Sequence, residues 1–153
     1  MSHEKRLVDA KLVLPPAPRA MGTYSTCVRH RDLLYVAGTG PLRPDGSYVV
    51  GKLGADLDLA AGRDAARLTA LAMLATLQTN LGSLDRVRRI VKVLGMVNST
   101  PDFTEHPQVI NGFSDLMKQV FGDAALAARS AVGTASLPAG IAVEVEAIFE
   151  IAE

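Results

Sequence analysis

The stretch 141–151 constrains the fold of this 153-residue chain more than any other part of the sequence. Apolar residues fill every second position of this stretch, and glutamate fills three of the five positions between them. A period of two with β-branched residues is typical of a strand that buries one face. The short mixed segment 129–136 precedes it, and residues 137–140 (Leu-Pro-Ala-Gly) have the composition of a turn. We therefore expect a closing hairpin that brings Arg129 towards Glu144 on one face of a sheet.

The composition is that of one folded domain with a hydrophobic core. Hydrophobic residues make up 48% of the chain, the mean hydropathy is +0.20, and 153 residues fit a single domain. Sixteen basic residues balance sixteen acidic ones. A net charge of zero argues against an electrostatic nucleic-acid partner. Together with the high apolar content, it indicates that some apolar surface is covered in an oligomer.

Metal sites, disulfides and membrane segments find no support in the sequence. Cys27 is the single cysteine, so neither an intrachain disulfide nor a cysteine-based metal site can form. The three histidines, His3, His30 and His106, are scattered, and we expect no bound metal. The N-terminus lacks the apolar core of a signal peptide, and no apolar run reaches the length of about 18 residues that a membrane span needs. We therefore expect a cytoplasmic protein without a membrane partner.

The order of the predicted elements indicates an α+β fold. We expect, in order, a short helix at 4–12, strands at 24–29 and 33–37, a helix from Asp58 to Leu81, a strand at 86–98, a helix at 107–121 and the closing hairpin. Within 86–98 we expect strict alternation, with Arg89 and Val91 on the same face as Val93. The two long helices must cover one face of a mainly antiparallel sheet. The other face is mixed, and we expect neighbouring subunits to close it.

Strong catalytic motifs are missing, and the best polar candidate is the pair Arg129 and Glu144. The chain contains no P-loop, no G-x-S-x-G elbow and no H-E-x-x-H. The glycines of Gly38-Thr39-Gly40 lead into a proline rather than a helix, so we interpret them as a loop and not as a phosphate site. Arg129 and Glu144 fit two hypotheses. They form a surface or intersubunit ion pair, or Arg129 binds a carboxylate by a two-pronged hydrogen bond while Glu144 holds a water or moves a proton.

Several short motifs resemble one known family. The closing residues Arg129-Ser-Ala-Val, Leu137-Pro and Val143-Glu-Val-Glu-Ala-Ile148 are similar to the C-terminal signature of the Rid family, the reactive-intermediate deaminases also called YjgF-like or L-PSP endoribonuclease-like proteins. Met21-Gly-Thr-Tyr24 and Leu34-Tyr-Val-Ala-Gly38 resemble earlier motifs of the family. The segment from His106 to Gly122 is similar to a longer-chain branch with an N-terminal extension. The resemblance divides the chain into an extension at 1–19 and a single Rid-like domain at 20–153.

The resemblance implies a fold, an assembly and an activity. The family fold is chorismate mutase-like, and its members form homotrimers whose sheets close into a central barrel, with ligand sites between subunits. Its best-known activity is hydrolysis of small enamines and imines, such as 2-aminoacrylate, to 2-keto acids and ammonia, without a cofactor. Carried over by position, Arg129 binds the carboxylate of the small-molecule ligand and Glu144 positions the attacking water. Tyr24, Gly38, Thr39, Ala131 and Ile110 line the cleft.

The sequence departs from the family pattern at three of these positions. Thr39 stands where many deaminating members have glutamine, Ala131 where they often have cysteine, and Ile110 where the cleft has asparagine, although Asn111 is one place away. Two alternatives to deamination stay open. One is a non-catalytic metabolite sensor that uses the same clefts, and the other is the endoribonuclease or translation inhibitor that the family names suggest. Charge and aromatic content give RNA binding little support.

Overall fold

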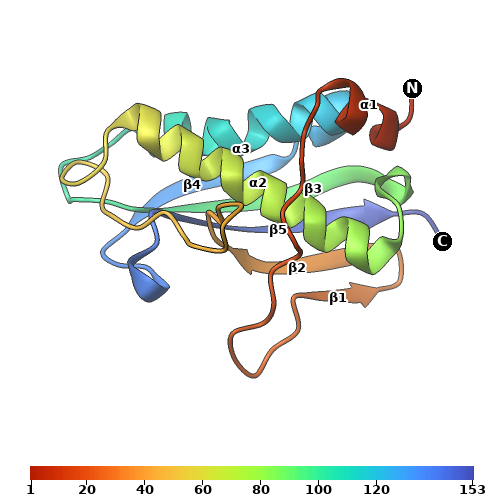
Figure 1. Ribbon diagram of the computed structural model, residues 1–153, viewed down its shortest axis with the longest axis horizontal. Helices are drawn as coiled ribbons and strands as arrows, with labels where there is room; N and C mark the ends of the chain where they lie inside the picture. Colours follow the sequence, from red (N-terminus) through yellow and green to blue (C-terminus); the bar gives the residue numbers. More distant parts are fainter.

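The two segments with helical periodicity form α2 (Leu59–Leu81) and α3 (His106–Phe121) in the computed structural model, which describes residues 1–153. Asp58 caps α2 as predicted, because its Oδ1 accepts the N–H of Ala61 at 2.8 Å. Gly82 ends α2 in the left-handed conformation, with φ of 78°. Pro107 lies in the first turn of α3, as predicted. Both helices pack against each other on one face of the sheet (Figure 1).

The sheet has five strands and mixed pairing, which confirms an α+β fold. The strands are β1 (Cys27–His30), β2 (Leu33–Thr39), β3 (Val87–Asn98), β4 (Ala128–Thr134) and β5 (Val143–Ile151). Their order is β1-β2-β5-β3-β4. β1 and β2 form the predicted hairpin, with His30 opposite Leu33. All neighbouring strands are antiparallel except β3 and β4, which are parallel.

The predicted hairpin of residues 129–136 with 141–151 is wrong. β4 lies parallel to β3 on one side, whereas β5 lies antiparallel to β3 on its other side. The cause is α3, which crosses over the sheet and returns the chain to the starting end of β3, so that β3, α3 and β4 form a βαβ unit. Residues 137–140 therefore do not form a hairpin turn. They contain a short 3₁₀ turn (Pro138–Gly140) within a connection that leads from β4 past the end of β3 to β5.

Strict alternation in β3 is also wrong over its first half. The pairing of β3 with β5 shifts register between Val87 and Arg89 and again between Ile90 and Lys92. These β-bulges each insert a residue, so Ile90 is buried and Val91 is 39% exposed. From Val93 onward the alternation holds, with Val93 and Val97 facing the helices. The bulges could not be predicted from the sequence, because the order of valine and arginine residues in this half of β3 does not reveal where a residue is inserted.

The two faces of the sheet differ in what covers them. The face under α2 and α3 forms the core together with these helices, and the core includes the fully buried Phe149 of β5 and Phe113 of α3. The opposite face, which we call the open face, is uncovered within one chain. Its apolar side chains Val28, Tyr35 and Val132 are 56%, 44% and 43% exposed. Large exposed apolar groups gathered on one sheet face are typical of a surface that another molecule covers.

The N-terminal segment is tied to the ends of both long helices. It begins with the short helix α1 (His3–Asp9). The Oε1 of Glu4 accepts the backbone N–H of Leu84 at 2.7 Å, and the His3 ring lies edge-on to Phe121 at 4.9 Å. From α1 the chain runs past α2 to the loop before β1 (Figure 1). It thereby carries residues 18–24 to the cavity described below.

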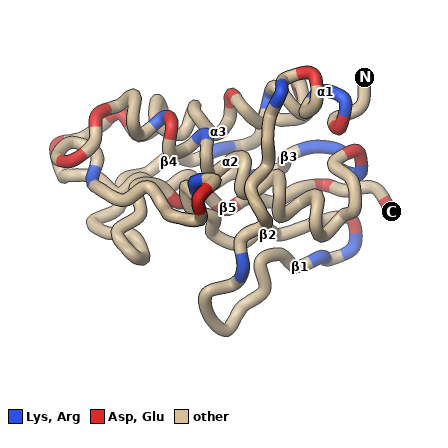
Figure 2. Tube along the Cα trace, viewed as in Figure 1, with Lys and Arg blue, Asp and Glu red and all other residues tan.

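Basic and acidic residues are interspersed along the chain, as Figure 2 shows. No helix combines the length and the hydrophobicity that a membrane crossing requires.

Candidate functional site

A cavity of about 690 Å³ lies beside β2 and β5 and brings together four of the predicted site residues: Tyr24, Gly38, Thr39 and Glu144. The chain before β1 supplies Tyr24, β2 supplies Gly38 and Thr39, and β5 supplies Glu144. The 3₁₀ turn after β4 contributes Pro138 and Ala139. A volume of this size accommodates a small organic molecule.

Glu144 is the ionisable group at the centre of this arrangement. Gly38 lies directly beneath it, and a methyl group at Gly38 would overlap the Glu144 carboxylate. The carboxylate is half-buried and has no hydrogen bond or ion pair within the chain. Burial raises the pKa of Glu144, and the nearby charge of Glu146 raises it further. A carboxyl group without an internal partner and with a raised pKa is suited to exchanging protons with a bound molecule.

The two hydroxyl side chains of the cavity are held differently. The hydroxyl oxygen of Tyr24 accepts the backbone N–H of Met21 at 3.2 Å, which leaves its own proton free for a ligand. Thr39 is buried, and its Oγ1 donates to the carbonyl of Ala37 at 3.0 Å. Thr39 thus offers a ligand only an acceptor. β2 shifts register against β5 between Val36 and Thr39, and this irregularity shapes the cavity wall.

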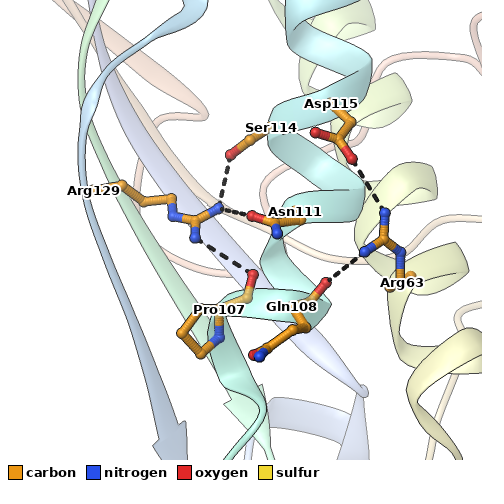
Figure 3. A network of polar contacts seen from close by, with 7 residues as sticks. All are labelled: Arg63, Pro107, Gln108, Asn111, Ser114, Asp115 and Arg129. Carbon is orange, nitrogen blue, oxygen red and sulfur yellow. Dashed lines mark hydrogen bonds and ion pairs between the residues drawn. The ribbon is translucent and has the colours of Figure 1, made fainter.

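Arg129 does not line this cavity. Its guanidinium is hydrogen-bonded to residues of helix α3 (Figure 3). Its Nη1 donates to Asn111 Oδ1 at 2.9 Å and to Ser114 Oγ at 3.1 Å. Its Nη2 donates to the carbonyl of Pro107 at 3.4 Å, and its Nε makes no hydrogen bond. These hydrogen bonds therefore fix one side of the guanidinium, and the N–H groups on its other side remain free. A fixed guanidinium with free N–H groups is prepared to bind an oxyanion.

The predicted approach of Arg129 to Glu144 is wrong within one chain. Arg129 is opposite Val93 and Glu144 is opposite Met96, and these two positions of β3 lie an odd number of residues apart. Because side chains alternate along a strand, Arg129 lies on the helix side and Glu144 on the open face. The hairpin error is the cause, since the prediction made the two strands direct neighbours.

Ala131 and Ile110 belong with Arg129 and not with the cavity. Ala131 follows Arg129 on the same side of β4 and packs against the core. Ile110 is fully buried, with its side chain over Gly95, so it does not reach a ligand. Its neighbour Asn111 is the α3 residue that faces Arg129. The spacing of Asn111 and Ser114 is the signal that would have revealed these two partners, because polar residues three apart share one side of a helix.

Two other residues were not foreseen in the sequence. Arg19 is the single cation among the residues that line the Glu144 cavity, and Tyr48 is a further lining aromatic. Both come from irregular segments, where no periodicity marks them. Elsewhere, Arg63 of α2 donates to Asp115 Oδ2 at 3.1 Å and to the carbonyl of Gln108, and so joins α2 to α3 behind the Arg129 cluster (Figure 3).

The five-stranded mixed sheet with helices on one face is the architecture of YjgF/chorismate mutase-like proteins. The model of the family described as "YjgF/chorismate mutase-like, putative endoribonuclease" matches residues 4–148. The chain therefore belongs to this family, as the resemblance in its motifs predicted.

Three relatives illustrate the similarity. Protein TCP17 of Trypanosoma cruzi is 45% identical over 139 residues, which span 90% of this chain and 87% of that protein. The crystal structure of Atu1372 from Agrobacterium tumefaciens, a protein of unknown function, has a TM-score of 0.90 and 40% identity, and the match covers 98% of this chain and 92% of that one. A Shewanella oneidensis structure described as a "putative endoribonuclease" has a TM-score of 0.94 and 31% identity, and the match covers 99% of this chain and 100% of that one.

Proposed function

We propose that this protein hydrolyses small enamine or imine intermediates that carry a carboxylate, giving 2-keto acids and ammonia. The observation that carries the proposal is Glu144, a carboxyl group with a raised pKa and no internal partner, beside a cavity sized for a small metabolite. A cationic fork, Arg129, is held ready for a carboxylate. Membership of the YjgF/chorismate mutase-like family supports assigning the reaction to Arg129 and Glu144 together.

The two functional groups can meet only through a second copy of the chain. Arg129 is carried by β4, the edge strand of the sheet, and Glu144 faces the opposite side. We therefore infer a homotrimer in which Arg129 of one subunit completes the Glu144 cavity of the next. The exposed apolar residues of the open face support such an assembly, since they require a cover.

The reaction needs a water, a proton relay and an oriented substrate. Arg129 binds the substrate carboxylate and places the imine carbon near Glu144. The Glu144 carboxylate takes a proton from water as the water oxygen adds to the imine carbon. The reacting form is the imine protonated at nitrogen, which an enamine reaches by taking a proton from solvent at its terminal carbon. Glu144 then returns the water proton to the nitrogen and accepts the proton of the new hydroxyl group as the C–N bond breaks, so that ammonia leaves, the carbonyl forms and the last proton passes to solvent. The free proton of the Tyr24 hydroxyl is available to hold the substrate during these steps.

The decisive experiment follows the loss of 2-aminoacrylate generated in situ. Wild type should accelerate its loss, and Arg129→Ala should reduce kcat/KM by about 10²-fold, the scale of a lost bidentate charged contact. Arg67→Ala, which removes an exposed arginine of α2, is the matched control and should leave the rate unchanged. If Arg19→Ala abolishes turnover while Arg129→Ala does not, the carboxylate is bound within one chain and the assignment to Arg129 is wrong.

Ligand binding without turnover is the second candidate function, because Thr39 and Ala131 depart from the deaminating pattern. It predicts saturable binding of a 2-keto acid with no acceleration of any imine. RNA cleavage, which the family description suggests, would require nuclease activity that co-purifies with the protein and is lost in Glu144→Gln.

A further inference from the structure

A second cavity, of about 510 Å³, lies at the carboxyl ends of β3 and β4, where α3 begins. It shares no lining residue with the Glu144 cavity. Its first lining residue on β4 is Gly133, four residues beyond Arg129 and therefore about 13 Å further along the strand. In βαβ units, ligands bind outside the carboxyl ends of the parallel strands. The position of this cavity in the fold is thus one that favours binding.

A lysine with an unneutralised charge lines this second cavity. The Nζ of Lys52 donates to Asn98 Oδ1 at 2.9 Å and to the carbonyl of Ala135. Both acceptors are neutral, and none of the three ion pairs of the molecule involves Lys52. No aspartate or glutamate is among the residues that line the cavity. The ammonium group is therefore held in place with its positive charge available to a bound anion.

A serine and a histidine form the polar wall of the same cavity. Ser99 Oγ, at the end of β3, is hydrogen-bonded to His106 Nε2 at 3.2 Å. The ring of Phe103 lies edge-on to the imidazole, with centroids 5.4 Å apart, and so fixes its orientation. Gly133 leaves room for the pair, since a methyl group there would overlap the imidazole and come within 2.7 Å of Ser99 Oγ.

We propose that this cavity is a second small-molecule site, which binds the anionic oxygens of a phosphate or carboxylate group. Lys52 supplies the charge, and Ser99 and His106 supply hydrogen bonds. The cavity is larger than one oxyanion, so its ligand is a small metabolite whose remaining atoms lie against Phe103 and Pro101. The proposal is independent of deamination, because it uses neither Arg129 nor Glu144.

The test is a titration of the full-length protein with inorganic phosphate and, separately, with acetate at constant ionic strength, followed by backbone amide NMR. We expect saturable shifts confined to Ser99, His106 and Thr134. Lys52→Met should weaken binding about tenfold or more, the scale of a hydrogen bond to a charged group. Lys118→Met, which removes an exposed lysine of α3 outside the cavity, should leave it unchanged.

Further variants keep the proposal open to refutation. Ser99→Ala removes only a hydroxyl group, so it should weaken binding several-fold without changing the fold. This variant tests the proposal even if Lys52→Met does not fold. Saturation by phosphate alone, or by acetate alone, supports the proposal and assigns the group that the site prefers. Shifts that fail to saturate at millimolar concentration, or that are the same in Lys52→Met and Lys118→Met, would overturn it. Loss of these shifts in Arg129→Ala would also overturn it, because the cavity would then belong to the Arg129 site.

Discussion

The surroundings of Glu144 disfavour its ionised form, and this has a consequence for stability. Its pKa in the folded chain is raised above the ordinary value of 4.5, so the folded state binds its proton more tightly than the unfolded state does. The unfavourable contribution is absent well below pH 4.5, where both states are protonated. It grows as the pH rises through the raised pKa and is complete above it. The group to which we assign the chemistry therefore weakens the fold above its raised pKa.

We predict that Glu144→Gln is more stable than wild type at about pH 8 and that the difference disappears near about pH 4. The measurement is the thermal midpoint Tm of both proteins across this pH range. Glu105→Gln, at an exposed glutamate without a side-chain hydrogen bond, should follow wild type throughout. The same Glu144→Gln protein should lose imine hydrolysis at every pH. A Tm that falls at pH 8 would show that a partner, such as Arg129 of the next subunit in the proposed trimer, stabilises the Glu144 carboxylate.

Gly38 is required by the position of the Glu144 carboxylate. Gly38→Ala places a methyl group where the carboxylate lies, and the flexible end of the glutamate must move away. We predict a loss of about 10²-fold in kcat with little change in Tm, since a displacement of about 1 Å has that effect on a positioned catalytic group. Gly22→Ala is the matched control, because its methyl group meets only the Tyr24 ring at 3.6 Å. An unfolded Gly38→Ala protein would contradict the prediction.

Helix α3 connects the core to Arg129, and its packing depends on one close approach to α2. At Gly112 the backbone of α3 lies against the backbone of Arg63, so that a methyl group would overlap the Arg63 carbonyl. The backbone of Arg63 cannot move aside to relieve this overlap as a flexible side chain could. We predict that Gly112→Ala lowers the free energy of unfolding by about 1–3 kcal/mol, as overpacking does, measured by chemical denaturation. Gly62→Ala meets the flexible Leu53 side chain instead and should have a smaller effect.

Helices and the first hairpin could be predicted from the sequence because their determinants are local. Asp58 and Gly82 mark the ends of α2 by their own chemistry, and Pro107 marks the start of α3. The partner of β4 could not be predicted in this way. It depends on the end of the sheet to which α3 returns the chain, and alternation in β4 and β5 is equally compatible with either pairing.

The same distinction between local and long-range determinants applies to the residues of the candidate site. Tyr24, Gly38, Thr39 and Glu144 lie around one cavity as the motifs predicted. Arg129 was singled out from its motif, whereas its partners on α3 required knowledge of which helix face covers β4. Ile110 was misplaced by one residue, and one residue on a helix turns a side chain by about 100°, from cleft to core.

A single chain leaves the open face uncovered and the two halves of the proposed site apart. The proposed homotrimer accounts for both, since it buries Val28, Tyr35 and Val132 and brings a second Arg129 to each Glu144. We predict a stable trimer by light scattering at micromolar concentration. Val132→Asp should dissociate it, because a charge would then be buried in the interface. It should abolish hydrolysis although every residue of the proposed site is intact. A stable wild-type monomer would contradict the assembly.

Mixing two inactive variants tests whether each site is shared between chains. Arg129→Ala keeps Glu144 and Glu144→Gln keeps Arg129, so neither homotrimer has a complete site. After the two proteins are unfolded and refolded together in equal amounts, subunits associate at random. About a quarter of the sites then combine an intact Arg129 with the intact Glu144 of its neighbour. We predict that about this fraction of wild-type activity returns. Refolding each variant alone is the control and should restore none. If the mixture is as inactive as its components, Arg129 and Glu144 do not act across an interface.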